Sequence, residues 1–116
     1  MFENSKGDNG MLKESDWKLF RRKLPEWQER HMQNLLGEYA GIIASAGPAS
    51  TRFWKLKERL QKDVRHVGVC ANIKRSTMLH NLLAMFGEQA ITLEDLDGFS
   101  DDLRRQVAIF GEGKMP

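Results

Sequence analysis

Apolar residues recur every three or four positions through most of this chain, which is the spacing of one face of an α-helix. No segment alternates apolar and polar residues in the two-residue period of a β-strand. With 116 residues the chain has the length of one domain. The sequence therefore predicts an all-α fold, a small antiparallel bundle of about five helices joined by short connections.

Prolines and glycines set the expected helix boundaries. Pro25 lacks a backbone N–H and suits the first turn of a helix, so we expect one helix over 15–23 and a second over 25–44. Pro48 predicts the start of a third helix over 48–65, and Gly87 suits the end of a fourth over 73–88. The segment 66–72 is expected to be a connection, and 91–111 to hold two short helices that end at Gly111.

Side chains that accept hydrogen bonds from free N–H groups mark the helix starts. Ser15 or Asp16 is expected to cap the first helix. Thr92 and Asp95 have the spacing of a capping box, and Ser100 precedes two acids at the start of the last helix. We expect a helical domain over 13–111, with flexible tails over 1–12 and 112–116.

One face of each expected helix is apolar, and these faces predict the core. Trp54 lies off the stripe of its helix and is expected to be an exposed anchor for a partner. The predicted core residues are Trp17, Phe20, Leu24, Trp27, Met32, Leu35, Leu36, Tyr39, Ile42, Ile43, Phe53, Leu56, Leu60, Val64, Met78, Leu79, Leu82, Leu83, Phe86, Leu103, Val107 and Phe110.

Charge is distributed unevenly although the net charge is only +2. Residues 11–75 carry 14 Lys and Arg against 7 acids, and residues 76–116 carry 3 against 7. The single cysteine fits a reducing compartment, and we expect a cytoplasmic protein because the chain shows neither a signal peptide nor a membrane span.

The basic residues form the first candidate site. Four of them recur at helical spacing on the third expected helix, and others lie on the first and fourth. They suit either a solvated helix face or contact with a nucleic-acid backbone. The candidate residues are Arg52, Lys55, Arg59 and Lys62, assisted by Arg21, Arg22, Lys74 and Arg75.

An acidic patch near the C-terminus forms the second candidate site. It suits helix caps and a solvated face, or a surface that binds a basic partner protein. The candidate residues are Glu94, Asp95, Asp97, Asp101 and Asp102, with Trp54 as an additional anchor.

The sequence gives less support to a catalytic or metal-binding function. Cys70 follows His66 by four residues, within reach of a helical turn, but no orienting acid or oxyanion pocket accompanies them. The spacing of the cysteine and the three histidines matches no zinc pattern. We expect no catalytic residues, no metal and no cofactor.

Four segments, "SDWKLFRRKLPEWQERHM", "FWKLKERLQKDVRHVGV", "KRSTM" and "ITLEDLDGFSDDLRRQV", resemble a family of short proteins from gut-dwelling Firmicutes. Members lie near mobile elements and are often labelled "multidrug transporter", although nothing in this chain has the length to cross a bilayer. The resemblance implies a cytoplasmic protein and supplies no catalytic residues.

Two hypotheses follow from these observations. The first is a regulatory protein of a mobile element that contacts nucleic-acid backbone through the basic helix face. The alternative is an inhibitor that binds a protein or ribonucleoprotein, such as a defence nuclease of the CRISPR type, through the acidic patch. The oligomeric state and the identity of the partner stay open.

Overall fold

The computed structural model describes residues 13–113, and every regular element in that range is helical. The expected tail 1–12 and the last three residues of the expected tail 112–116 lie outside the described residues, whereas 112 and 113 belong to the last helix, so the tail prediction was wrong for those two residues. The elements are α1 (Glu14–Ala44), α2 (Ala49–Asp63), α3 (Val67–Cys70), α4 (Met78–Gly87) and α5 (Asp101–Gly113), with 3-10 turns at Arg75–Thr77 and Leu93–Leu96. The all-α prediction is confirmed. No helix among residues 13–113 combines the length and hydropathy needed to cross a bilayer.

Helix α1 runs without a break through Pro25, so the expectation of two helices there was wrong. A proline inside a helix costs about 3 kcal/mol, because it removes one hydrogen bond and crowds the preceding turn. Tertiary packing offsets this cost: Phe20 and Leu24 before the proline and Trp27 after it are buried in the same core. The rings of Phe20 and Trp27 meet edge to face with their centroids 6.4 Å apart.

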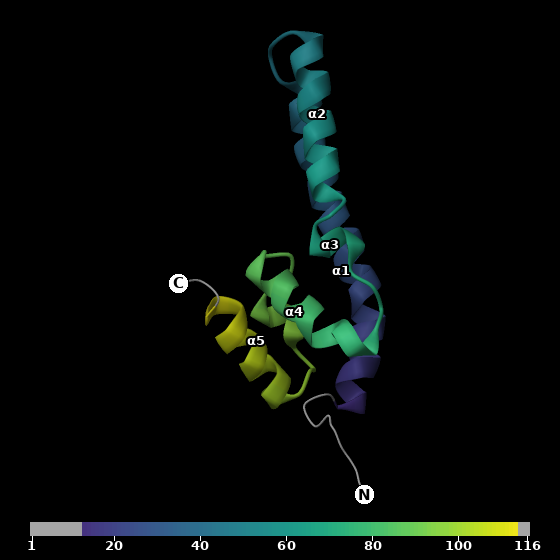
Figure 1. Cartoon of the computed structure of the whole chain (residues 1–116), viewed down its shortest axis with the longest axis vertical. Coiled ribbons are helices and arrows are strands. Elements are labelled where there is room, and N and C mark those ends of the chain that lie inside the picture. The colour runs from purple at the N-terminus through teal and green to yellow at the C-terminus, as the bar shows by residue number, and fades with distance from the viewer. Residues whose placement is uncertain (1–12, 114–116) are drawn as a thin grey trace, which may run out of the picture.

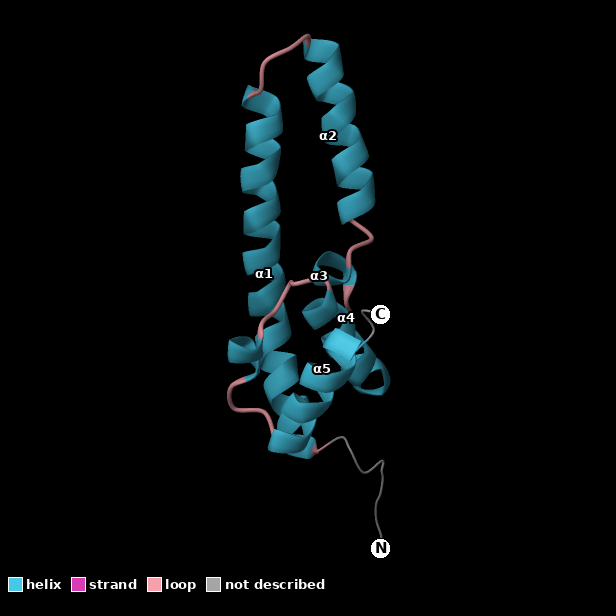
Figure 2. Cartoon of the chain, turned by 90° about the vertical axis from the view of Figure 1, so that its left-hand side faces the viewer, coloured by secondary structure: helices cyan, strands magenta, loops and turns pink. Residues whose placement is uncertain are grey.

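The chain divides into a body and a protruding hairpin (Figure 1). The body comprises residues 13–31 and 65–113, where α3, α4 and α5 pack beside the first half of α1. The hairpin comprises residues 32–64, where the second half of α1 turns at Gly47 and returns as α2 (Figure 2). Helix α1 is about 46 Å long at 1.5 Å per residue, so it serves as the spine of both parts.

One hydrophobic core lies in the body. Trp17 and Trp27 are buried in it, as the helical spacing predicts, and Trp27 stacks on Phe99 at 6.1 Å. Leu82 of α4 and Val107 of α5 are completely buried between the helices. Gly111 also lies inside, because an added Cβ there would stand 2.4 Å from the Phe86 ring. Helix α5 continues past Gly111 and ends at Gly113, so the expectation that it ends at Gly111 was wrong.

Polar contacts between distant segments hold the body together. Asp16 caps nothing on α1, whose N-cap is Lys13 and forms no side-chain cap. Its buried carboxylate instead accepts hydrogen bonds from the Ser100 backbone N–H (2.8 Å) and hydroxyl (2.7 Å). The Ser100 hydroxyl oxygen in turn accepts from the Leu103 N–H at 3.2 Å, so Ser100 caps α5 as predicted.

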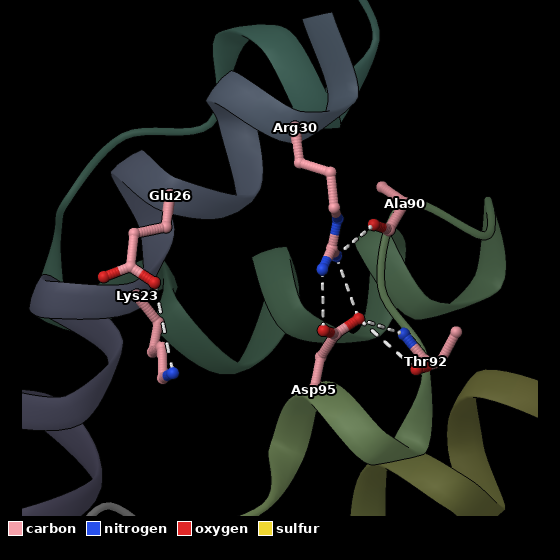
Figure 3. A network of polar contacts seen from close by, with 6 residues as sticks. All are labelled: Lys23, Glu26, Arg30, Ala90, Thr92 and Asp95. Atoms are coloured by element: carbon pink, nitrogen blue, oxygen red, sulfur yellow. Dashed lines mark hydrogen bonds and ion pairs between the residues drawn. The ribbon is translucent and has the colours of Figure 1, made fainter. Parts of the chain in front are cut away.

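Arg30 ties α1 to the segment before α5 (Figure 3). Its guanidinium donates to both Asp95 carboxylate oxygens at 2.9 Å and to the Ala90 carbonyl at 3.2 Å. Asp95 also accepts from the Thr92 N–H at 2.8 Å, which completes the expected capping box. The ion pair holds the pKa of Asp95 below its usual range although partial burial opposes this, and it raises the pKa of Arg30.

Candidate functional site

The hairpin presents an open apolar face. We define the hairpin face as Leu36 and Ile43 of α1 with Phe53, Leu60 and Val64, the last residue following α2 directly. All five side chains are exposed, Phe53 at 63%. The periodicity predicts them as core, and that prediction was wrong because α2 packs mainly on α1, which leaves this side of the helix pair exposed.

The five residues lie on one side of the helix pair. At about 100° per residue, Phe53, Leu60 and Val64 fall within about 40° of one another around α2. Leu56, about 60° from Phe53 around α2, is half-buried. Exposed apolar residues scattered singly are ordinary, whereas a contiguous apolar patch on two helices marks an interaction site.

A groove opens on the hairpin face near the body. Its volume is about 200 Å³, and aliphatic side chains from α1, α2 and α3 make up most of its lining. Tyr39 and Asp63 form its floor, where the Tyr39 hydroxyl donates to the Asp63 carboxylate at 2.6 Å. Burial and this bond raise the pKa of Tyr39 to about 12. The lining residues are Met32, Leu35, Leu36, Tyr39, Leu60, Asp63, Val64 and Val69.

The opposite face of the hairpin is polar and internally bonded. Arg59 pairs with Glu38 at 2.5 Å and with Asp63 at 3.3 Å, and its guanidinium lies 5.7 Å from the Tyr39 ring centroid. The Glu38 hydrogen bond raises the pKa of Arg59. Arg52 donates to the Ile43 carbonyl at 2.7 Å and to the Gly47 carbonyl at 3.3 Å, at the C-terminal end of α1. Both arginines therefore hold the hairpin closed.

The structure divides the expected basic stripe. Lys55 and Lys62 are exposed on the outer edge of α2, and no ion pair within 13–113 involves them. Arg75 forms two hydrogen bonds to Glu14, at 2.8 and 3.2 Å, and its guanidinium lies 5.1 Å from the Trp17 ring, with Arg21 at 5.9 Å from the same ring. Arg22 and Lys74 are exposed at the far end of the body. The eight residues do not form one continuous surface.

The expected acidic patch is also largely paired. Asp95 is held by Arg30, Asp101 pairs with Arg104, and Asp102 pairs with Arg105 at 3.2 Å. Glu94 and Asp97 are exposed. Trp54 is 57% exposed as expected, with its ring against Phe53 at 5.2 Å and the Lys57 ammonium at 5.4 Å. An anchor residue therefore sits beside the hairpin face rather than beside the acidic patch.

His66 and Cys70 form their polar contacts with different partners. The His66 Nδ1 accepts from the Gly68 N–H at 2.9 Å, and its Nε2 lies 2.9 Å from Glu88. The Cys70 thiol donates to the Arg65 carbonyl at 3.4 Å and is exposed. The His66 side chain thus positions the junction between hairpin and body.

His31 occupies the same junction, against His66 and Gly68. Its ring stacks on His66 with centroids 4.6 Å apart and lies against Gly68, where an added Cβ would meet it at 2.7 Å. Desolvation, followed by repulsion from His66, lowers the pKa of His31, while Asp63, Glu38 and Glu88 oppose this more weakly.

Because the folded state lowers the pKa of His31, the folded state binds fewer protons there than the unfolded chain. The stability from neutral His31 is present above the unfolded value near 6.5 and is lost as pH falls through it. We expect the free energy of unfolding in urea to decline modestly below pH 6.5, and the decline to shrink in His31→Gln. An unchanged slope in that variant would rule out His31 as its source.

Comparisons with known proteins return no match of any kind: no family model, no curated protein and no solved structure corresponds to this chain. The resemblance to the Firmicutes family stays a prediction. The site is therefore characterised by its own geometry, as an open apolar face with a groove at its base and a tryptophan at its edge.

Proposed function

We propose that the chain is a non-enzymatic protein-binding module that docks an apolar helical surface onto the hairpin face. The observation that carries the proposal is the exposure of five aliphatic and aromatic side chains on one side of two packed helices. Water-exposed apolar area contributes about 25 cal/mol per Å² when a partner buries it, so such a face favours association. Helices that lay an apolar stripe into a groove are a common mode of recognition.

The distribution of charge also supports a protein partner over a nucleic acid. The guanidinium groups of Arg52, Arg59 and Arg75 already form hydrogen bonds or ion pairs with other residues of the same chain. A surface that binds nucleic-acid backbone requires cations that face solvent together. Contact with nucleic acid is therefore the weaker candidate, and it would rest on the exposed Lys55 and Lys62 of α2 and on Arg22 and Lys74 of the body. The mobile-element setting and the defence-nuclease target stay predictions.

Site-specific photo-crosslinking in the native cells tests the proposal. A photoreactive phenylalanine analogue at Phe53 is expected to form discrete protein adducts, because this side chain projects from the hairpin face. The same analogue at Lys55, on the polar side of α2, is the matched control and is expected to form none. Leu60→Asp is expected to abolish the Phe53 adducts by placing a charge in the face.

Three results would contradict the proposal: no adduct from Phe53, equal adducts from both positions, or adducts that survive Leu60→Asp. Adducts that disappear in the double variant Lys55→Glu with Lys62→Glu, while surviving Leu60→Asp, would instead support the basic edge as the binding surface. The mass of each adduct identifies the protein that is bound.

A further inference from the structure

We propose that the partner on the hairpin face is a second copy of this chain, related by a twofold axis that points the two hairpin tips in opposite directions. This inference rests on the proposed function and names its partner. The hairpin face carries the projecting Phe53 ring toward the tip and the groove at the base.

The ring and the groove fit one another in size and chemistry. The Phe53 ring is exposed, and the groove near Leu60 and Val64 has a volume of about 200 Å³. An apolar cavity of about 150 Å³ is enough to hold a benzene ring. Phe53 and Val64 are separated by about 16 Å along α2, at 1.5 Å per residue. Within one chain the ring therefore cannot reach its own groove.

A twofold axis with opposed tips brings the two features together. When α2 lies antiparallel across its copy near Lys57, the Phe53 ring of each chain lies over the groove of the other. The contact is made twice, which is the self-complementarity that a closed dimer requires. Each helix then has antiparallel neighbours, as α1 and α2 already have in the hairpin, and the four form an antiparallel bundle.

The body leaves this face clear. Trp27, which is buried in the body core, and Leu36 on the hairpin face are nine residues apart on α1. At about 100° per residue this spacing places them on opposite sides of the helix. The helices α4 and α5 accordingly lie to one side of the hairpin (Figure 1). A second hairpin can approach from the other side without meeting the first body.

Area and charge are both compatible with a reversible dimer. Two helices of about 10 Å width over the roughly 22 Å length of α2 present about 440 Å² in flat projection. The two chains together bury twice this projection, roughly 880 Å², and side-chain relief brings the accessible area toward the lower end of specific interfaces, about 1,200 Å² in total. Lys57 would meet its copy near the axis, but its ammonium lies against the Trp54 ring at the outer edge.

Sedimentation velocity over the micromolar range tests the inference on the full chain. We expect a shift with concentration from 13.4 kDa to twice that mass. Phe53→Asp is expected to leave only monomer, with an unchanged helical circular dichroism spectrum because the ring is exposed. Phe110→Asp is the matched control: Phe110 on α5 is exposed to a similar degree, 60%, but lies off the hairpin, so its variant is expected to dimerise normally.

Cysteine cross-linking tests the orientation. In a Cys70→Ser background, Lys57→Cys lies near the proposed axis and is expected to form dimers with a short bismaleimide. Lys55→Cys lies on the polar side of α2 and is expected to form none. A chain that stays monomeric, a dimer insensitive to Phe53→Asp, or cross-linking from Lys55→Cys alone would overturn the inference. Adducts of Phe53 with a different protein would still uphold the proposed function.

Discussion

Asp16→Ala is expected to lower the free energy of unfolding by about 3 kcal/mol, because hydrogen bonds to a charged group contribute about 1.5–3 kcal/mol each. Asp16 is 1% exposed and accepts both the backbone N–H and the hydroxyl of Ser100. Truncation leaves the Ser100 N–H without its acceptor inside the body. The effect extends further, because Ser100 also caps α5 and its hydroxyl loses its fixed orientation.

Urea denaturation followed by circular dichroism measures this loss, with Asp102→Ala as the control. Asp102 is an exposed acid in the first turn of the same helix and pairs with Arg105 on the surface. Its removal is expected to cost less than about 1 kcal/mol, as for other surface pairs and helix-end charges. Equal losses in the two variants would show that Asp16 acts only through its charge.

Local signals in the sequence predicted the features that depend on neighbouring residues. The capping box of Thr92 and Asp95 and the cap at Ser100 need only three or four consecutive residues, and both are present. The burial of Trp17 and Trp27 and the exposure of Trp54 follow from helical spacing. Such features can be predicted from the sequence because they depend on residues that are close together along one helix.

Features that join distant segments could not be predicted in this way. Asp16 and Ser100 are 84 residues apart, and Arg30 and Asp95 are 65 apart. The stripe that includes Arg59 is visible in the sequence, but its pairing with Glu38 depends on the hairpin. Continuity of α1 through Pro25 likewise depends on the body core, which outweighs the local preference for a break.

The hairpin face shows a further limit of periodicity. Helical spacing groups Phe53, Leu60 and Val64 on one side of α2, and the structure confirms the grouping. Spacing does not say whether another element covers that side, and among the described residues none does. An apolar stripe that the sequence assigns to the core can therefore be a docking surface. The two cases are told apart by how much the stripe contributes to the free energy of unfolding of the monomer.

The same substitution at two leucines separates the core from the hairpin face. Leu82→Ala is expected to lower the free energy of unfolding by about 2–5 kcal/mol, the range for a buried leucine that leaves a cavity. Leu82 is completely buried between α4 and its neighbours. This loss is a large fraction of the 5–15 kcal/mol typical of a small domain, and lowers the melting temperature by roughly 10 °C or more.

Leu60→Ala removes the same atoms from the hairpin face, where the side chain is 42% exposed, and is expected to cost less than about 1.5 kcal/mol in the monomer. Dilute samples, below the range of self-association, isolate this intrinsic effect in urea melts. At higher concentration the loss is expected to grow, because a partner that binds only the folded state adds stability that rises with the logarithm of the partner concentration once this exceeds the Kd. A cost near that of Leu82→Ala in dilute solution would place Leu60 in the core and remove the open face on which the docking proposal depends.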